Sequence, residues 1–164
     1  MENLNLFDEE TAPVTRTIRI RSIRPVYKTE IVREAAPGWV SIMCSSPETV
    51  FELFRDLARE TKEYFVSLHL DTKNRILCYE VVSIGSLNAS IVHPREVFKS
   101  ALLSSAAALI FLHNHPSGDT RPSGEDIKIT QRLKEAGELL GIRVLDHLIV
   151  CEEGYYSLVG GGHL

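Results

Sequence analysis

Long apolar runs are absent from this 164-residue sequence. A helix that crosses a bilayer needs about 20 consecutive, mostly apolar residues, and no run in the chain approaches that length. The opening residues, MENLNLFDEE, also lack the basic start and apolar centre that are typical of a signal peptide. We therefore expect a soluble, cytoplasmic protein with no membrane partner.

The sequence is also poor in cysteine and has no overall basic character. Its three cysteines, Cys44, Cys78 and Cys151, are scattered and set among apolar neighbours, which is typical of reduced thiols in a core. The net charge of -4 argues against a chain built mainly to bind nucleic acid. Neither a disulfide framework nor a general nucleic-acid surface is predicted.

The composition divides the chain into a short arm and one domain. A hydrophobic content of 44% in 164 residues suits a single globular domain with a sizeable core. Pro37 and Gly38 mark a boundary, so we expect a polar tail and a basic, strand-like arm over residues 1–40 and the domain over residues 41–164. The bases of the arm are Arg16, Arg19, Arg21, Arg24, Lys28 and Arg33. They either keep a strand edge solvated or contact phosphates.

Periodicity within the domain predicts alternating helices and strands. Apolar residues recur at helical spacing over residues 47–62, 94–105 and 124–140. Residues 64–71 and 75–85 alternate as the strands of a hairpin, and further strands are predicted over 107–112, 142–150 and 155–159. Helices placed between strand pairs favour an α/β fold, a three-layer α/β/α domain with a mixed sheet.

One stretch, HNHPSGDTRPSGED at residues 113–126, contains side chains that suit a metal site. His113 and His115 follow a buried strand two residues apart, so both point to the same side of the chain. Ser123 and Asp126 form a helix-capping pattern that places the carboxylate in the first turn of a helix. Two imidazoles and one carboxylate suit zinc and leave a fourth position open for water.

The same residues have a plainer interpretation, as a polar turn followed by an ordinary helix cap. The combination of ligand-capable side chains around a strand-to-helix return favours the metal site, and an open position indicates catalysis. Zinc hydrolysis also needs a carboxylate that moves a proton. Glu63 and Glu80 are both candidates, because both lie on or beside the predicted hairpin.

The pattern H-x-H-P-x6-S-x-x-D resembles the metal motif of the JAB1/MPN/JAMM zinc metalloproteins. The wording HNHPSGDTRPSGEDI, the following TQRLKEAGELLGIRVLDHLIV and the upstream VHPRE are similar to the bacterial RadC branch. The resemblance covers roughly residues 46–159. It implies a RadC-like JAMM domain of the cytidine-deaminase-like α/β/α fold, with His113, His115 and Asp126 as zinc ligands.

The resemblance also suggests roles for residues outside the ligand set. Glu63 opens the segment EYFVSL, which looks like the strand start that carries the family's catalytic glutamate, so it is preferred over Glu80. Ser123 looks like the family's oxyanion donor, although a helix cap is the other role open to it. His147 is expected to be a core or supporting histidine and not a fourth ligand.

Together these features predict a zinc-dependent hydrolase, and the family resemblance implies a metallopeptidase or isopeptidase acting on a peptide or isopeptide partner. The RadC resemblance also implies an alternative, a DNA-associated repair or recombination module without peptidase activity. The segment that precedes the JAMM-like domain in longer RadC proteins resembles a helix-hairpin-helix, whereas residues 1–36 are shorter and strand-like. The natural substrate and the oligomeric state are not predicted.

Overall fold

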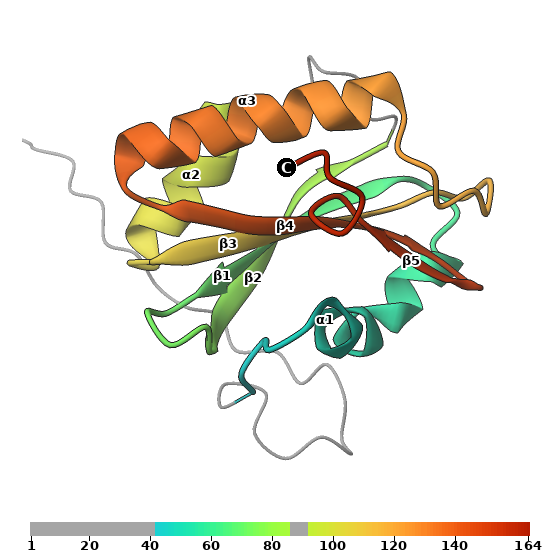
Figure 1. The fold of residues 1–164 in the computed structure, drawn as a ribbon, viewed down its shortest axis with the longest axis horizontal. Coiled ribbons are helices and arrows are strands. Elements are labelled where there is room, and N and C mark those ends of the chain that lie inside the picture. Colours follow the sequence, from blue (N-terminus) through green and yellow to red (C-terminus); the bar gives the residue numbers. More distant parts are fainter. Residues whose placement is uncertain (1–41, 86–91) are drawn as a thin grey trace, which may run out of the picture.

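A computed structural model describes residues 42–85 and 92–164, and within them five strands form one mixed sheet (Figure 1). The strand order is β2-β1-β3-β4-β5. The strands are β1 (Tyr64–Leu70), β2 (Ile76–Ile84), β3 (Ala108–Asn114), β4 (Arg143–Cys151) and β5 (Gly154–Ser157). Strands β3 and β4 pair in parallel and the other neighbours pair antiparallel. The strand that leads into the histidine motif is therefore the central one.

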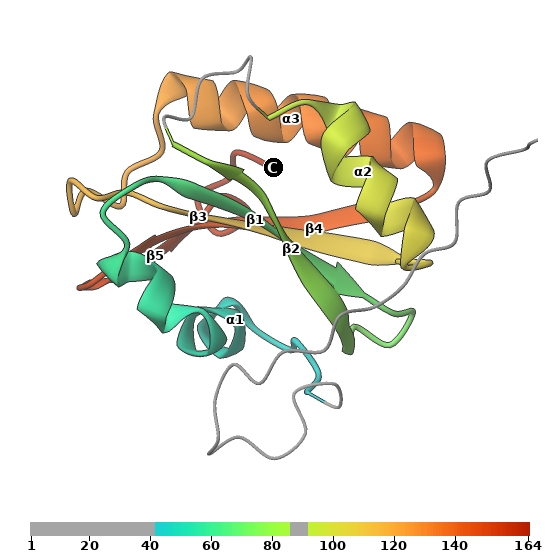
Figure 2. The same ribbon diagram turned by 180° about the vertical axis from the view of Figure 1, so that it is seen from behind.

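Helices cover both faces of this sheet, as Figures 1 and 2 show from opposite sides. Helix α1 (Pro47–Leu53) and a short 3-10 helix, η2 (Arg55–Arg59), lie on one face. Helices α2 (Pro94–Leu103) and α3 (Gly124–Leu140) lie on the other. The predicted three-layer α/β/α arrangement with a mixed sheet is confirmed. None of the described helices is both long and apolar enough to cross a bilayer.

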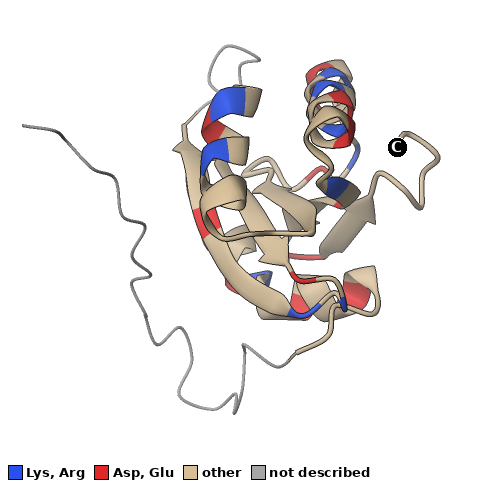
Figure 3. Ribbon diagram, turned by 90° about the vertical axis from the view of Figure 1, so that its left-hand side faces the viewer, with Lys and Arg blue, Asp and Glu red and all other residues tan. Residues whose placement is uncertain are grey.

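Alternation along the strands builds a separate core on each face. Leu68, Ile110 and Leu112 pack toward α1, whereas Phe65 and Phe111 pack toward α2 and α3. All seven residues of β3 are buried, because a central strand covered on both faces has no solvent side. Apart from the buried Asp126, the charged residues of α2 and α3, whose places along the helices Figure 3 marks, are exposed or half-buried. Any polar side chain on β3 must therefore find its partners inside the protein.

The structure departs from the sequence prediction in two places. The single helix predicted over 47–62 is an α-helix followed by a 3-10 turn, because Phe54 leaves the helical conformation with φ -111° and ψ 17°. Leu57 still packs on the core, but Thr61, which lies within the predicted helix, is exposed and outside it. Strand β3 continues two residues beyond its predicted end and includes His113 and Asn114. The predicted arm and its bases lie outside the described residues, as does the predicted boundary between arm and domain.

The three cysteines are free thiols. The sheet also holds a buried histidine that is remote from the motif. His69 on β1 is fully buried under α2. Its Nδ1 lies 2.8 Å from Ser104 Oγ and 3.4 Å from Cys78 Sγ. Burial lowers the pKa of His69 to about 4. The folded protein therefore keeps this imidazole neutral at pH values where the unfolded chain protonates it.

His69 should make the domain less stable in mild acid. As the pH falls from about 6.5 to about 4, the imidazole of His69 binds a proton in the unfolded state but not in the folded state. The contribution of this group should therefore lower the free energy of unfolding by about 3 kcal/mol. Denaturant unfolding at pH 7 and pH 5 measures the effect. His69→Asn should flatten the pH dependence, whereas His163→Asn, at an exposed position, should leave it unchanged. Equal slopes in wild type and His69→Asn would contradict the assignment.

Candidate metal centre

Two histidines of the motif meet where β3 leaves the sheet. His113 is the sixth residue of β3, pairs with Phe65 of β1 and is fully buried on the α2/α3 face. His115 follows the strand and is partly buried, and its amide donates to the Val150 carbonyl of β4. The two Nε2 atoms are 2.9 Å apart. The predicted convergence of the two imidazoles is present.

Asp126 completes the cluster from the first turn of α3. Its Oδ1 lies 3.4 Å from His113 Nε2, its Oδ2 lies 3.5 Å from His115 Nε2, and its side chain is 4% exposed. All three ligand atoms fall within 4.8 Å of one another. A tetrahedral zinc ion with bonds of about 2.1 Å separates its ligand atoms by roughly 3.4 Å. Each imidazole lies at about that separation from one of the two carboxylate oxygens, and the two Nε2 atoms lie closer together, so the cluster could hold a small divalent cation.

A capping box holds Asp126 in place. Ser123 caps α3, and its Oγ accepts a hydrogen bond of 3.1 Å from the Asp126 amide. In return the Asp126 Oδ2 accepts one of 2.7 Å from the Ser123 amide. The cap fixes the carboxylate relative to the helix axis, which a ligand on the first turn requires. The predicted cap is confirmed.

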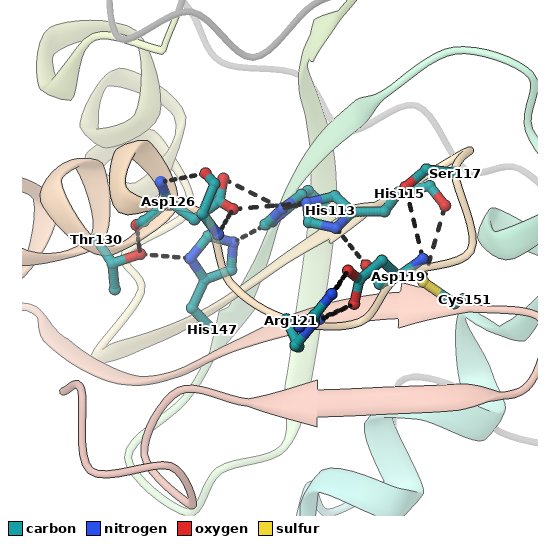
Figure 4. A network of polar contacts seen from close by, with 10 residues as sticks. His113, His115, Ser117, Asp119, Arg121, Asp126, Thr130, His147 and Cys151 are labelled. Carbon is teal, nitrogen blue, oxygen red and sulfur yellow. Dashed lines mark hydrogen bonds and ion pairs between the residues drawn. The ribbon is translucent and has the colours of Figure 1, made fainter.

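The loop between the histidine pair and α3 fixes the ring of His115. His115 Nδ1 lies 2.6 Å from the Asp119 carbonyl oxygen, which can only accept a hydrogen bond. The Nδ1 of His115 therefore carries a hydrogen, and in the neutral ring Nε2 has the free lone pair. Two guanidinium nitrogens of Arg121, Nε and Nη2, donate to the Asp119 carboxylate and hold this loop in place, as Figure 4 shows. The nitrogen of His115 that points toward the cluster is therefore the one that could bind a metal ion.

The electrostatics of the cluster suit a cation. Burial would raise the pKa of Asp126, but the imidazoles of His113 and His115 next to it hold that pKa well below its usual range. The adjacent Asp126 carboxylate raises the pKa of His115, whereas burial lowers the pKa of His113. Burial also holds the pKa of His147 well below its usual value. The site thus contains a carboxylate that stays ionised and two buried imidazoles that stay neutral.

The two candidate glutamates lie in different surroundings. Glu63 immediately precedes β1, and its charge makes a small contribution that favours the protonated forms of His113 and His115, although burial lowers the pKa of His113 overall. Glu80 lies on β2, the edge strand beyond β1, and accepts a hydrogen bond from Ser100 of α2. The choice of Glu63 over Glu80 as the catalytic carboxylate stays a prediction.

Asn114 anchors the segment that carries Glu63. This fully buried side chain points to the opposite face of the sheet from His113. Its Oδ1 accepts from the Tyr64 amide at 2.7 Å, and its Nδ2 donates to the carbonyls of Lys62 at 2.9 Å and Glu60 at 3.2 Å. The role of Asn114 could not be predicted from the sequence, because its hydrogen-bond partners lie about 50 positions earlier in the chain. Its position between the two histidines therefore couples the motif to the start of β1.

His147 contacts the cluster from behind. It lies on β4 beside Phe111 of β3, and its Nε2 is 2.8 Å from Nδ1 of His113. Its Nδ1 is 2.5 Å from the hydroxyl of Thr130 on α3. The expectation of a supporting histidine agrees with this position (Figure 4). Nothing in the spacing of the motif pointed to Thr130, one helical turn after Asp126.

Comparison with known proteins places the chain in a family. A family model described as RadC-like JAB domain matches residues 44–163. The chain belongs to the RadC-like JAB domain family. It is 60% identical over 119 residues to a UPF0758 protein of Methanosarcina mazei, covering 72% of this chain and 52% of that protein. It is 44% identical over 174 residues to a UPF0758 protein of Methanococcoides burtonii, covering 100% of this chain and 76% of that protein.

The matched region is the part that contains the sheet and the motif. A UPF0758 protein of Syntrophotalea carbinolica is 56% identical over 121 residues, which cover 73% of this chain and 53% of that protein. The chain thus spans about half the length of most of the curated relatives it matches. The predicted RadC-like JAB/JAMM assignment is confirmed.

Replacing Asn114 by alanine should loosen the start of β1. The loss of three hydrogen bonds to backbone groups, some of them buried, should lower the free energy of unfolding by about 2–3 kcal/mol. Denaturant unfolding measures the loss, and hydrogen exchange should show faster exchange at the Tyr64 amide. Ser117→Ala, in the exposed loop, serves as the control and should change stability by less than about 0.5 kcal/mol. An unchanged Tyr64 exchange rate in Asn114→Ala would contradict the anchoring role.

Proposed function

We propose that the protein is a zinc-dependent hydrolase that cleaves an amide-type bond, as a metallopeptidase or isopeptidase. The observation that carries the proposal is the buried convergence of His113, His115 and Asp126. Three protein ligands of nitrogen and oxygen type, with a fourth position left open, are the pattern of catalytic zinc sites. Membership of the RadC-like JAB family supports the same reaction class.

The side chains around the cluster divide the work of hydrolysis. Zinc, when bound, acts as a Lewis acid and lowers the pKa of water. Glu63, whose charge acts on both histidines, takes the proton from the attacking water and returns it to the leaving nitrogen. Ser123 is exposed at the first turn of α3, where its hydroxyl proton stabilises the developing oxyanion while its oxygen keeps the capping bond.

The alternative role in DNA repair or recombination has less support from this chain. Its basis in the sequence is the arm containing Arg16, Arg19 and Arg21, which lies outside the described residues. No described group favours a nucleic-acid substrate at the cluster. The proposal therefore remains a hydrolase with a peptide or isopeptide substrate.

Purified protein supplied with zinc should contain about one ion per chain. Asp126→Ala removes the only carboxylate of the ligand set and should lose most of the bound zinc, since the two histidines alone bind weakly. Elemental analysis after desalting measures the content. Glu125→Gln, a carboxylate change at the exposed position next to Asp126, is the matched control and should retain zinc. Zinc-free wild type prepared in this way would overturn the proposed metal.

Glu63→Gln should keep zinc but slow cleavage by about 10²–10⁴-fold, because glutamine cannot take the proton from water. The assay uses a peptide library and a branched peptide whose isopeptide bond joins a carboxyl group to a lysine side chain. Glu80→Gln changes the competing carboxylate in the same way and should leave the rate within about twofold. Equal rates in wild type and Glu63→Gln would refute the role of Glu63. A wild type that loads zinc but cleaves neither substrate set would count against peptidase activity.

A further inference from the structure

A chain of hydrogen bonds begins at the metal cluster and returns to it through the core. His113 Nδ1 lies 2.8 Å from His147 Nε2, and His147 Nδ1 lies 2.5 Å from Thr130 Oγ1. Thr130 Oγ1 in turn lies 2.5 Å from the backbone carbonyl oxygen of Asp126. All four residues are buried, with exposures of 0% for His113, His147 and Thr130 and 3% for Asp126. Figure 4 shows the chain running from His113 to helix α3.

The backbone carbonyl of Asp126, the last member of the chain, sets the direction of every hydrogen bond in it. A carbonyl oxygen can only accept, so the Thr130 hydroxyl donates its single hydrogen to Asp126. The Thr130 oxygen can then only accept from His147, so Nδ1 of His147 carries the hydrogen. The neutral His147 ring therefore presents a lone pair at Nε2, and that lone pair accepts from His113 Nδ1. His113 is left with its own lone pair on Nε2.

That nitrogen is the one that faces the other two ligands. Nε2 of His113 lies 2.9 Å from Nε2 of His115 and 3.4 Å from Asp126 Oδ1. The same aspartate supplies the carbonyl that orders the chain and the carboxylate that faces its far end. The circuit thus joins β3, β4 and the first turn of α3 in a single closed path. A change of tautomer at His113 would break it.

We propose that Thr130 and His147 are positioning residues that hold His113 as the Nδ1–H tautomer and so keep its Nε2 available to a metal ion. His147 serves the site as a hydrogen-bond acceptor and does not ligate. The inference rests on the proposed metal site but not on any hydrolytic activity. Partners that fix a ligating histidine from its far nitrogen typically change metal affinity by about 10–100-fold.

The first test reads the tautomers directly and needs no metal. Long-range nitrogen–proton NMR spectra of the metal-free protein at pH 8 distinguish the two neutral forms of each imidazole. We expect Nδ1–H for both His113 and His147 in wild type, and loss of that pattern at His147 in Thr130→Val. An Nε2–H tautomer at either ring in wild type would overturn the proposal, whatever the protein's activity.

The second test measures zinc affinity by competition with a chelating dye. Thr130→Val keeps the side-chain volume but removes the hydroxyl, and we expect the Kd for zinc to rise by about 10–100-fold. His147→Phe, among Phe65 and Phe111, should do the same, so the proposal does not depend on one variant folding. Thr130→Ser restores the hydroxyl and should restore the affinity.

The chain offers a matched control elsewhere on the same sheet face. Ser104 of the α2 C-terminus also donates to a helix carbonyl, that of Ala101, and contacts Nδ1 of the buried His69. Ser104→Ala therefore removes the same kind of bond away from the cluster, and its Kd for zinc should be unchanged. Unchanged zinc affinity in both Thr130→Val and His147→Phe, with wild type binding zinc, would overturn this inference and leave the hydrolase proposal standing. A wild type that binds no zinc would overturn both.

Discussion

The convergence of two imidazole nitrogens and one carboxylate in a buried space is the constraint on which the rest of the structure depends. Each of these atoms presents lone pairs, and His113 and Asp126 have almost no exposure to water that could satisfy them. Bringing such groups together without a positive charge between them is unfavourable. The surrounding residues hold the arrangement through bonds on the far sides of the rings and through the capping box.

The fold provides these bonds from elements that are far apart in the sequence. Central strand β3 presents His113 to one face of the sheet and Asn114 to the other. The parallel neighbour β4 brings His147 behind the first imidazole, and Glu63 immediately precedes the antiparallel neighbour β1. Helix α3 supplies the carboxylate from its first turn and Thr130 from its second. Sheet and helix therefore support the cluster from several sides.

The family comparison and the geometry of the site describe different aspects of the molecule. The family match covers the sheet, the helices and the motif, and it establishes the RadC-like JAB fold of this chain. The geometry adds what a family match does not contain, namely the directions of the hydrogen bonds around each ring. Those directions follow from two carbonyl oxygens, of Asp119 and Asp126, that can only accept. In the proposed metal site, both histidines would therefore ligate through the same nitrogen.

The sequence by itself determined the layers of the fold and which three side chains meet at the cluster. Alternation, helix caps and glycine stops are local signals, so the hairpin, α3 and the capping box at Ser123 could be predicted from short windows. His113, His115 and Asp126 lie within fourteen residues, close enough for their spacing to carry the prediction. The break at Phe54 was not predictable, because packing against the sheet overrode a continuous helical pattern. Only the tertiary structure could bring Asn114 to Tyr64 or His147 to His113, since strand register across 34 to 50 positions decides those contacts.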